Sequence, residues 1–158
     1  MVNSFQVDHT RLIPGVYISR KDYVGGDVVT TYDIRMKAPN REPVMETGVI
    51  HTLEHIGATF LRMYSCLDVI YFGPMGCRTG FYLVVAGKTD TQTLIASLQD
   101  LFTCVLLSQE IPGATEKECG NAADHDLPGA KAEAKKYLET VLMKLRTNER
   151  DSLQYPDQ

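Results

Sequence analysis

The sequence predicts an α+β fold in which a four-stranded antiparallel sheet carries helices packed on one face. Two pairs of short β-type runs, within residues 16–38 and 67–86, are each joined by a tight connection. One run with helical periodicity separates the pairs and two more follow them. Strand pairs with short connections favour an antiparallel sheet, and helices on one face leave the other face to solvent or to a partner.

The first strand pair follows an irregular segment, residues 1–15. Val16 to Ser19 predicts a short strand, Gly25-Gly26 predicts a turn, and the run from Val28 to Ala38 alternates between apolar and polar residues. We therefore expect a hairpin with one buried face. The buried face would hold Tyr32, Ile34 and Met36, and the opposite face Thr31, Asp33, Arg35 and Lys37.

The central helix is expected over residues 46–65, after a loop that contains two prolines. The apolar runs 67–72 and 81–86 predict the second strand pair, on either side of a glycine-rich loop.

Two more helices and a tail complete the chain. Asp90 is suited to cap a helix that runs to about Leu107, and Pro128 suits the first turn of the last helix. We interpret residues 1–158 as a single catalytic domain, with a polar tail at 147–158 that we expect to be frayed.

Composition and charge exclude several classes of function. Apolar residues make up 44% and charged residues 23% of the 158 positions, as in an ordinary globular domain. The net charge is −4 and no block of Lys or Arg stands out, so nucleic acid is not an expected partner. No apolar run approaches the ~20 residues of a membrane span, so no membrane association is expected. The N-terminus lacks a secretory signal, and we expect a cytoplasmic protein.

The strongest chemical signal is the pentapeptide His51-Thr52-Leu53-Glu54-His55 in the central helix. Two histidines one helical turn apart share a face and supply two ligands to a divalent metal. A carboxylate beside them reaches a metal-bound oxygen without being a ligand, and H-x-x-E-H is a known metal motif. The alternative is an exposed helix that happens to carry two histidines.

A third metal ligand must come from elsewhere in the chain, and three residues are candidates. Cys119 lies in a loop beside a glycine, Glu133 lies on the last helix, and His125 is equally suited to a surface or capping position. A glutamate ligand would fit an inverse-motif (HxxEH) zinc metallopeptidase in which Glu54 activates water. A non-enzymatic metal-binding module is a second rival, and it would need neither Glu54 nor a reactive cysteine.

Cys77 lies between Gly76 and Arg78 in the loop that joins the second strand pair. A neighbouring cation or metal lowers the pKa of a thiol, so this loop could hold a reactive thiolate. The alternative is a small buried residue in a tight turn.

Five segments in register carry a family resemblance. They are S-F-Q-V-D-H-T at 4–10, Y-D-I-R at 32–35, H-T-L-E-H at 51–55, P-M-G-C-R-T-G at 74–80 and E-C-G-N at 118–121. Any one segment would be weak evidence, but in this order and spacing they resemble the LuxS-type S-ribosylhomocysteine lyases, over about residues 4 to 146.

The resemblance implies an enzyme that cleaves S-ribosylhomocysteine to homocysteine and 4,5-dihydroxy-2,3-pentanedione, by carbonyl migration along the sugar and β-elimination. The second product is the precursor of the quorum-sensing signal autoinducer-2, and the reaction belongs to the activated methyl (methionine) cycle. The resemblance also implies one divalent metal per subunit, held by His51, His55 and Cys119. Fe2+ is the metal expected, and Zn2+ or Co2+ would be able to substitute.

By the same resemblance, Glu54 and Cys77 would be the catalytic residues that transfer protons, while Ser4, His9 and Arg35 would bind the substrate. The alternatives are a solvent-facing charge at a strand edge for Arg35 and a loop histidine bonded to backbone for His9.

The family forms homodimers, so we expect two sheet faces to meet and the active sites to be shared. One subunit would supply the metal ligands with Glu54, and the other Cys77 with Arg35. The sequence departs from the family pattern at Tyr71 and Gly73, where many relatives carry an aspartate and a serine. Tyr71 puts in doubt any role for an acid at that position, but it affects neither the metal ligands nor the proton-transfer residues.

Overall fold

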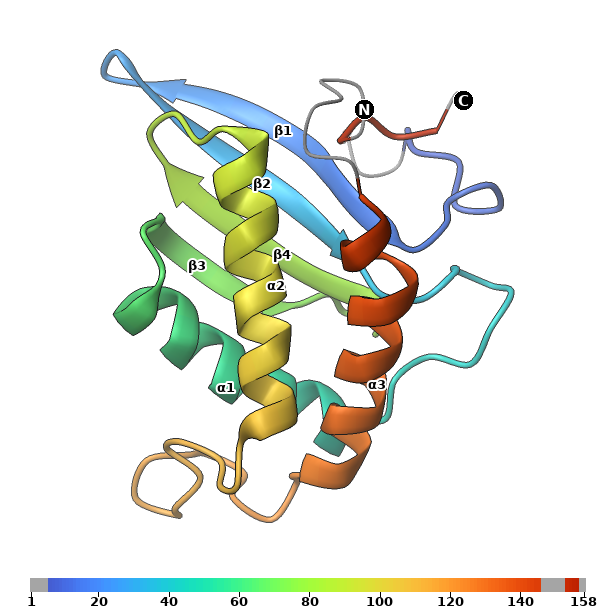
Figure 1. Cartoon of the computed structure of the whole chain (residues 1–158), viewed down its shortest axis with the longest axis vertical. Coiled ribbons are helices and arrows are strands. Elements are labelled where there is room, and N and C mark those ends of the chain that lie inside the picture. The colour runs from blue at the N-terminus through green and yellow to red at the C-terminus, as the bar shows by residue number, and fades with distance from the viewer. Residues whose placement is uncertain (1–5, 146–152, 157–158) are drawn as a thin grey trace.

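The computed structural model describes residues 6–145 and 153–156. The predicted α+β fold is confirmed, and Figure 1 shows its three helices on the same side of the sheet. The elements are β1 (Gly15–Val24), β2 (Asp27–Arg35), α1 (Thr47–Tyr64), β3 (Asp68–Pro74), β4 (Gly80–Ala86), α2 (Thr91–Leu107), α3 (Leu127–Thr140) and a short 3-10 helix (Leu142–Lys144). None of the described helices is long and apolar enough to cross a membrane.

The sheet is antiparallel throughout, in the order β1-β2-β4-β3. The two predicted strand pairs are hairpins, and they meet where β2 pairs with β4. The β1–β2 turn uses Gly25 and Gly26 at φ 58° and 92°, a left-handed backbone that glycine adopts without strain. β1 continues to Val24, beyond the predicted end at Ser19, because its backbone pairs with β2 as far as the turn.

The core lies between the helices and one face of the sheet. Alternate residues of β4, namely Phe81, Leu83 and Val85, are buried on this face, and Tyr32 and Ile34 of β2 continue it. The helix starts were predicted correctly: the Asp90 carboxylate accepts a hydrogen bond from Thr93 N at 2.9 Å, and α3 has Pro128 in its first turn.

The expectation that the β1–β2 hairpin buries only one face was wrong. Asp33 and Arg35 lie on the face away from the helices, yet they are 0% and 3% exposed. The residues that cover this end of the face include Tyr155 of the C-terminal segment, whose hydroxyl donates to Asp33 and whose ring stacks on Tyr17. Elsewhere the same face is open, and Tyr71 there is 50% exposed.

The prediction of a frayed tail was therefore wrong for Leu153 and Tyr155. Leu153 is 3% exposed, and its carbonyl oxygen accepts a hydrogen bond from Ile18 N at 2.7 Å. The rest of the tail, 147–152 and 157–158, lies outside the described residues.

Candidate metal centre

Four potential metal ligands converge beside α1. His51 and His55 lie one turn apart on the helix, while Cys119 and His125 come from the loop between α2 and α3. Their ligand atoms lie within 4.8 Å of one another, and we call these four residues the metal cluster. Figure 1 shows that loop at the same end of the molecule as the start of α1.

Backbone carbonyls fix the two helix histidines. The Nδ1 atom of His51 lies 2.9 Å from the carbonyl oxygen of Asp124, and that of His55 lies 2.8 Å from the carbonyl oxygen of Pro112. A carbonyl oxygen only accepts, so each Nδ1 carries the hydrogen and each Nε2 keeps a free lone pair. Metal-bound histidines are oriented by such hydrogen bonds, so both rings are prepared to bind.

The stacked rings allow only one of His51 and His125 to be a ligand, and the position of the Cys119 sulfur favours His51. The rings of His51 and His125 are stacked, with centroids 4.0 Å apart and an interplanar angle of 17°, whereas the ring of His55 meets both of them nearly at right angles, at 81° and 82°. A metal lies near the plane of each imidazole that binds it, so one ion cannot serve two stacked rings. The Cys119 Sγ atom is 3.4 Å from His51 Nε2 and 3.9 Å from His125 Nε2. The geometry thus favours His51, His55 and Cys119 as the ligands of a divalent metal, with His125 stacked against one of them.

His125 is held by its own neighbours. Its Nδ1 lies 3.2 Å from the hydroxyl of Thr52, which already donates to the Gly48 carbonyl oxygen. Burial, followed by the charges of His51 and His55, lowers the pKa of His125 and favours a neutral ring.

The two carboxylates singled out in the sequence have different surroundings. Glu54 Oε2 lies 4.0 Å from His55 Nε2 without belonging to the metal cluster, which fits a residue near the ligands. Glu133 instead pairs with Lys37 at 2.6 Å, so the suggestion that it is the third ligand was wrong.

A second group of polar side chains lies on β2 and the β3–β4 hairpin: Asp33, Arg35, Cys77 and Thr79. We call it the Cys77 cluster. The Arg35 guanidinium donates to both oxygens of Asp33, at 3.1 and 2.6 Å. Its NH1 donates to Thr79 Oγ1 at 2.6 Å and lies 3.9 Å from Cys77 Sγ.

The alternative interpretations of Arg35 and of Cys77 were both wrong. Arg35 is buried rather than solvent-facing, and Cys77 is exposed rather than buried in its turn. Burial opposes the charge of Arg35, but the hydrogen bonds and the negative charge of Asp33 outweigh it, so the pKa of Arg35 is raised. A permanent cation therefore lies beside an accessible thiol.

The other two predicted substrate-binding residues stay predictions. Ser4 lies outside the described residues. His9 Nδ1 lies 2.8 Å from the Val7 carbonyl oxygen, as in the alternative of a loop histidine bonded to backbone.

Two members of the Cys77 cluster, Asp33 and Thr79, were not predicted as site residues, and neither was Tyr155, which contacts that cluster. Asp33 had a signal, since it stands two residues before Arg35 on the same strand face. Thr79 shares the glycine-rich loop with Cys77. Tyr155 gave no signal, because nothing local distinguishes it from the rest of a polar tail.

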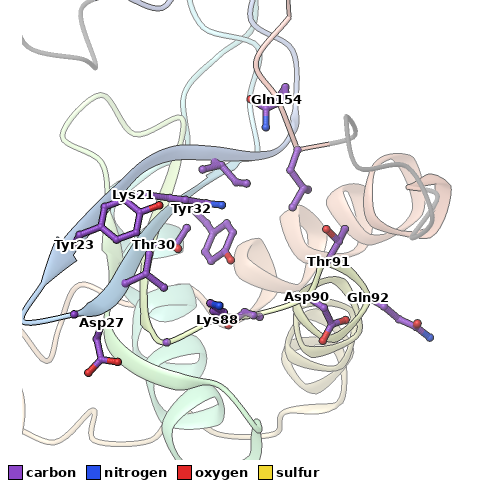
Figure 2. A pocket seen from close by; sticks show the side chains of 16 residues that line it. Lys21, Tyr23, Asp27, Thr30, Tyr32, Lys88, Asp90, Thr91, Gln92 and Gln154 are labelled. Atoms are coloured by element: carbon purple, nitrogen blue, oxygen red, sulfur yellow. The ribbon is translucent and has the colours of Figure 1, made fainter.

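A separate pocket lies between the β1–β2 hairpin and the start of α2 (Figure 2). Its lining includes Lys21, Tyr32 and Lys88, together with Leu153 and Gln154 of the C-terminal segment. None of the predicted site residues that the structure describes lines it, so it is distinct from both clusters.

Comparisons with known proteins agree with this geometry. A family model described as S-Ribosylhomocysteinase (LuxS) matches residues 2–148. Similar proteins named S-ribosylhomocysteine lyase include one from Finegoldia magna, 46% identical over 99% of this chain and 98% of its own length. Those from Borrelia garinii subsp. bavariensis and Phocaeicola vulgatus are 49% and 48% identical, over 98% of this chain and 98% and 96% of theirs.

Proposed function

This chain belongs to the S-ribosylhomocysteinase (LuxS) family, and on that premise we propose that it is an S-ribosylhomocysteine lyase working as a single catalytic domain. It is a metal-dependent carbon–sulfur lyase that releases homocysteine and 4,5-dihydroxy-2,3-pentanedione, the autoinducer-2 precursor. The observation that carries this conclusion is the convergence of His51, His55 and Cys119 in a chain 46–49% identical to proteins of that name.

The donor set fits one divalent metal, and we propose Fe2+ as the native ion. Two imidazole nitrogens and a thiolate suit ferrous iron, zinc or cobalt. When bound, the metal supplies Lewis-acid polarisation of a sugar oxygen. Elemental analysis of protein purified without oxygen identifies the ion, and zinc at full occupancy would contradict the iron assignment.

Proton transfers fall to Glu54 and Cys77. Each shift of the carbonyl, from C1 to C2 and from C2 to C3, removes a proton from the carbon that becomes the carbonyl and adds a proton to the carbon that was the carbonyl. The final elimination removes the C4 proton and breaks the bond between C5 and sulfur, so homocysteine leaves as a thiol. Glu54 lies beside the ligands without being one of them, and the Cys77 Sγ atom lies 3.9 Å from the Arg35 guanidinium, a position that suits a second proton-transfer group.

We propose a homodimer whose two active sites are shared between subunits. In the described residues no hydrogen bond, ion pair or ring contact joins the metal cluster to the Cys77 cluster. The sheet face that carries Cys77's neighbours is open over its other half, where Tyr71, Tyr82, Val84 and Ala86 are exposed or half-buried. A partner that packs on this face would bring its own metal cluster to Cys77.

Within such a site, Arg35 acts mainly beside Cys77. Asp33 and Thr79 occupy most of its donors, and its side chain is 4% exposed. We propose Ser4 and His9 as further substrate contacts, because both fall in the N-terminal segment that resembles the family.

The test is release of free thiol from S-ribosylhomocysteine by metal-loaded protein, followed with a thiol-reactive dye, beside a casein-cleavage assay. We expect thiol release and no proteolysis. Casein cleavage without thiol release would instead support the inverse-motif metallopeptidase. The ion pair between Glu133 and Lys37 argues against that enzyme, which would use Glu133 as a metal ligand.

A further inference from the structure

The C-terminal segment ends on the open side of the sheet with a tyrosine that reaches the Cys77 cluster. The ring of Tyr155 stacks on Tyr17, with centroids 4.9 Å apart and an interplanar angle of 24°. Its hydroxyl donates to Asp33 Oδ2 at 2.8 Å. Leu153 anchors the segment through its buried side chain and its hydrogen bond to the backbone of β1.

The same carboxylate oxygen receives two donors. Asp33 Oδ2 accepts from Tyr155 and also from Arg35 NH2, at 2.6 Å, while Arg35 NH1 faces Thr79 and Cys77. A continuous chain of contacts therefore runs from the tail to the exposed thiol, Tyr155 to Asp33 to Arg35 to Cys77.

Tyr155 remains a donor at every physiological pH. Burial, and then the charge of Asp33, raise its pKa far above the ordinary value. The same two causes raise the pKa of Tyr17 to about 12, and they also raise that of Tyr82, which faces Cys77 from β4. The charges near the thiol are thus Arg35, Arg78 of its own loop and Asp33 behind Arg35.

We propose that Tyr155 is a positioning residue, which holds the Asp33–Arg35 pair in the arrangement that faces the Cys77 thiol. The C-terminal segment is then part of the working site. The hydrogen bond from Tyr155 helps to fix the Asp33 carboxylate, and the carboxylate in turn keeps the Arg35 guanidinium at its distance from the sulfur. The proposal rests on the proton-transfer role proposed above for Cys77.

The decisive variant is Tyr155→Phe, which keeps the ring stacked on Tyr17 and removes only the hydroxyl. In metal-loaded protein, alkylation of Cys77 by iodoacetamide is followed by peptide mass analysis from pH 5 to 10. We expect the rate constant at pH 7 to fall by about 2- to 5-fold, with an unchanged limit at high pH, because Arg35 is no longer held at its position beside the sulfur. A purely structural role would lower the melting temperature and leave the shape of this pH profile unchanged.

Two matched controls come from the same chain. Tyr23→Phe removes a hydroxyl from an 80% exposed tyrosine of β1 and should leave the profile unchanged. Cys66 is exposed, and in every sample it reports the reactivity of a cysteine outside both clusters. A second variant that ends at Gln154 removes Tyr155 entirely and should lower the rate at pH 7 at least as much.

A Cys77 profile that coincides in Tyr155→Phe and wild type overturns the proposal. Full lyase activity in Cys77→Ala would overturn the role of Cys77 instead. The alkylation profile decides about Tyr155 in either case, since it needs no turnover.

Discussion

The metal cluster and the Cys77 cluster are held together in opposite ways. The metal cluster is held by backbone: helix spacing sets His51 and His55, and carbonyl oxygens of the α2–α3 loop orient their rings. The Cys77 cluster is held by side chains, through a buried ion pair between Asp33 and Arg35 and a tyrosine from the far end of the chain. Metal binding should therefore depend on single ligands. The arrangement around Cys77 should depend instead on the charge balance of the Asp33–Arg35 pair and on the C-terminal segment.

Removal of the Cys119 side chain from the metal cluster should have the largest effect. Cys119→Ala leaves two histidines, too few protein ligands for the usual three of a catalytic site. We expect the variant to lose its metal during purification and its lyase activity with it, as measured by elemental analysis and thiol release. Cys66→Ala, at an exposed cysteine, should keep both. Full metal occupancy in Cys119→Ala would remove Cys119 from the ligand set.

The proton-transfer residues should give the next largest effect, and they test whether the two clusters work across subunits. Glu54→Gln and Cys77→Ala should each keep the metal and lose turnover by a factor on the order of 10²–10⁴. Unfolding and refolding an equal mixture makes about half the dimers mixed, each with one intact site, so roughly a quarter of wild-type activity should return.

The refolded mixture should stay inactive if the active site is not shared between subunits. If both residues serve the same subunit's site, no combination is intact and the mixture stays inactive. Mixed dimers must be demonstrated by a tagged pull-down, and an inactive sample that contains them ends the shared-site model. Loss of metal in Glu54→Gln would make Glu54 a ligand instead.

The charge balance between Asp33 and Arg35 should affect the free energy of unfolding. Asp33→Ala leaves Arg35 buried without its partner, which typically costs about 3–5 kcal/mol of unfolding free energy. Urea denaturation of the metal-loaded protein measures it. Asp22→Ala is the matched control, because its pair with Arg20 is exposed and should leave the midpoint unchanged. Equal midpoints for both variants would mean that water reaches Arg35.

The smallest effect is expected at His125, which stacks on His51 and lies farther than His51 from the Cys119 sulfur. His125→Ala should weaken metal binding about 10-fold, as removal of a supporting residue does, and His125→Phe should weaken it less because a ring still covers His51. Competition with a chromogenic chelator measures both affinities. A loss as large as that in His51→Ala would make His125 a ligand.

The sequence by itself determined the features that repeat over a few residues. Alternation with period two placed β2 and β4, helical periodicity placed α1, and the i, i+4 spacing of His51 and His55 put both imidazoles on one face of that helix. The five matched segments then implied the family and, with it, Cys119 as the third ligand. These inferences succeeded because each depends on local backbone geometry or on a motif in the chain.

Only the tertiary structure decided which distant residues meet. The residue types alone left Cys119, Glu133 and His125 open as the third ligand, and the fold separated them: Cys119 lies in the metal cluster, Glu133 pairs with Lys37, and His125 stacks on His51. Period two also put Asp33 and Arg35 on the face away from the core, but it could not tell that Tyr155, more than a hundred residues later, would help to cover them. A strand's pattern specifies which side a residue points to, whereas what lies on that side depends on long-range packing.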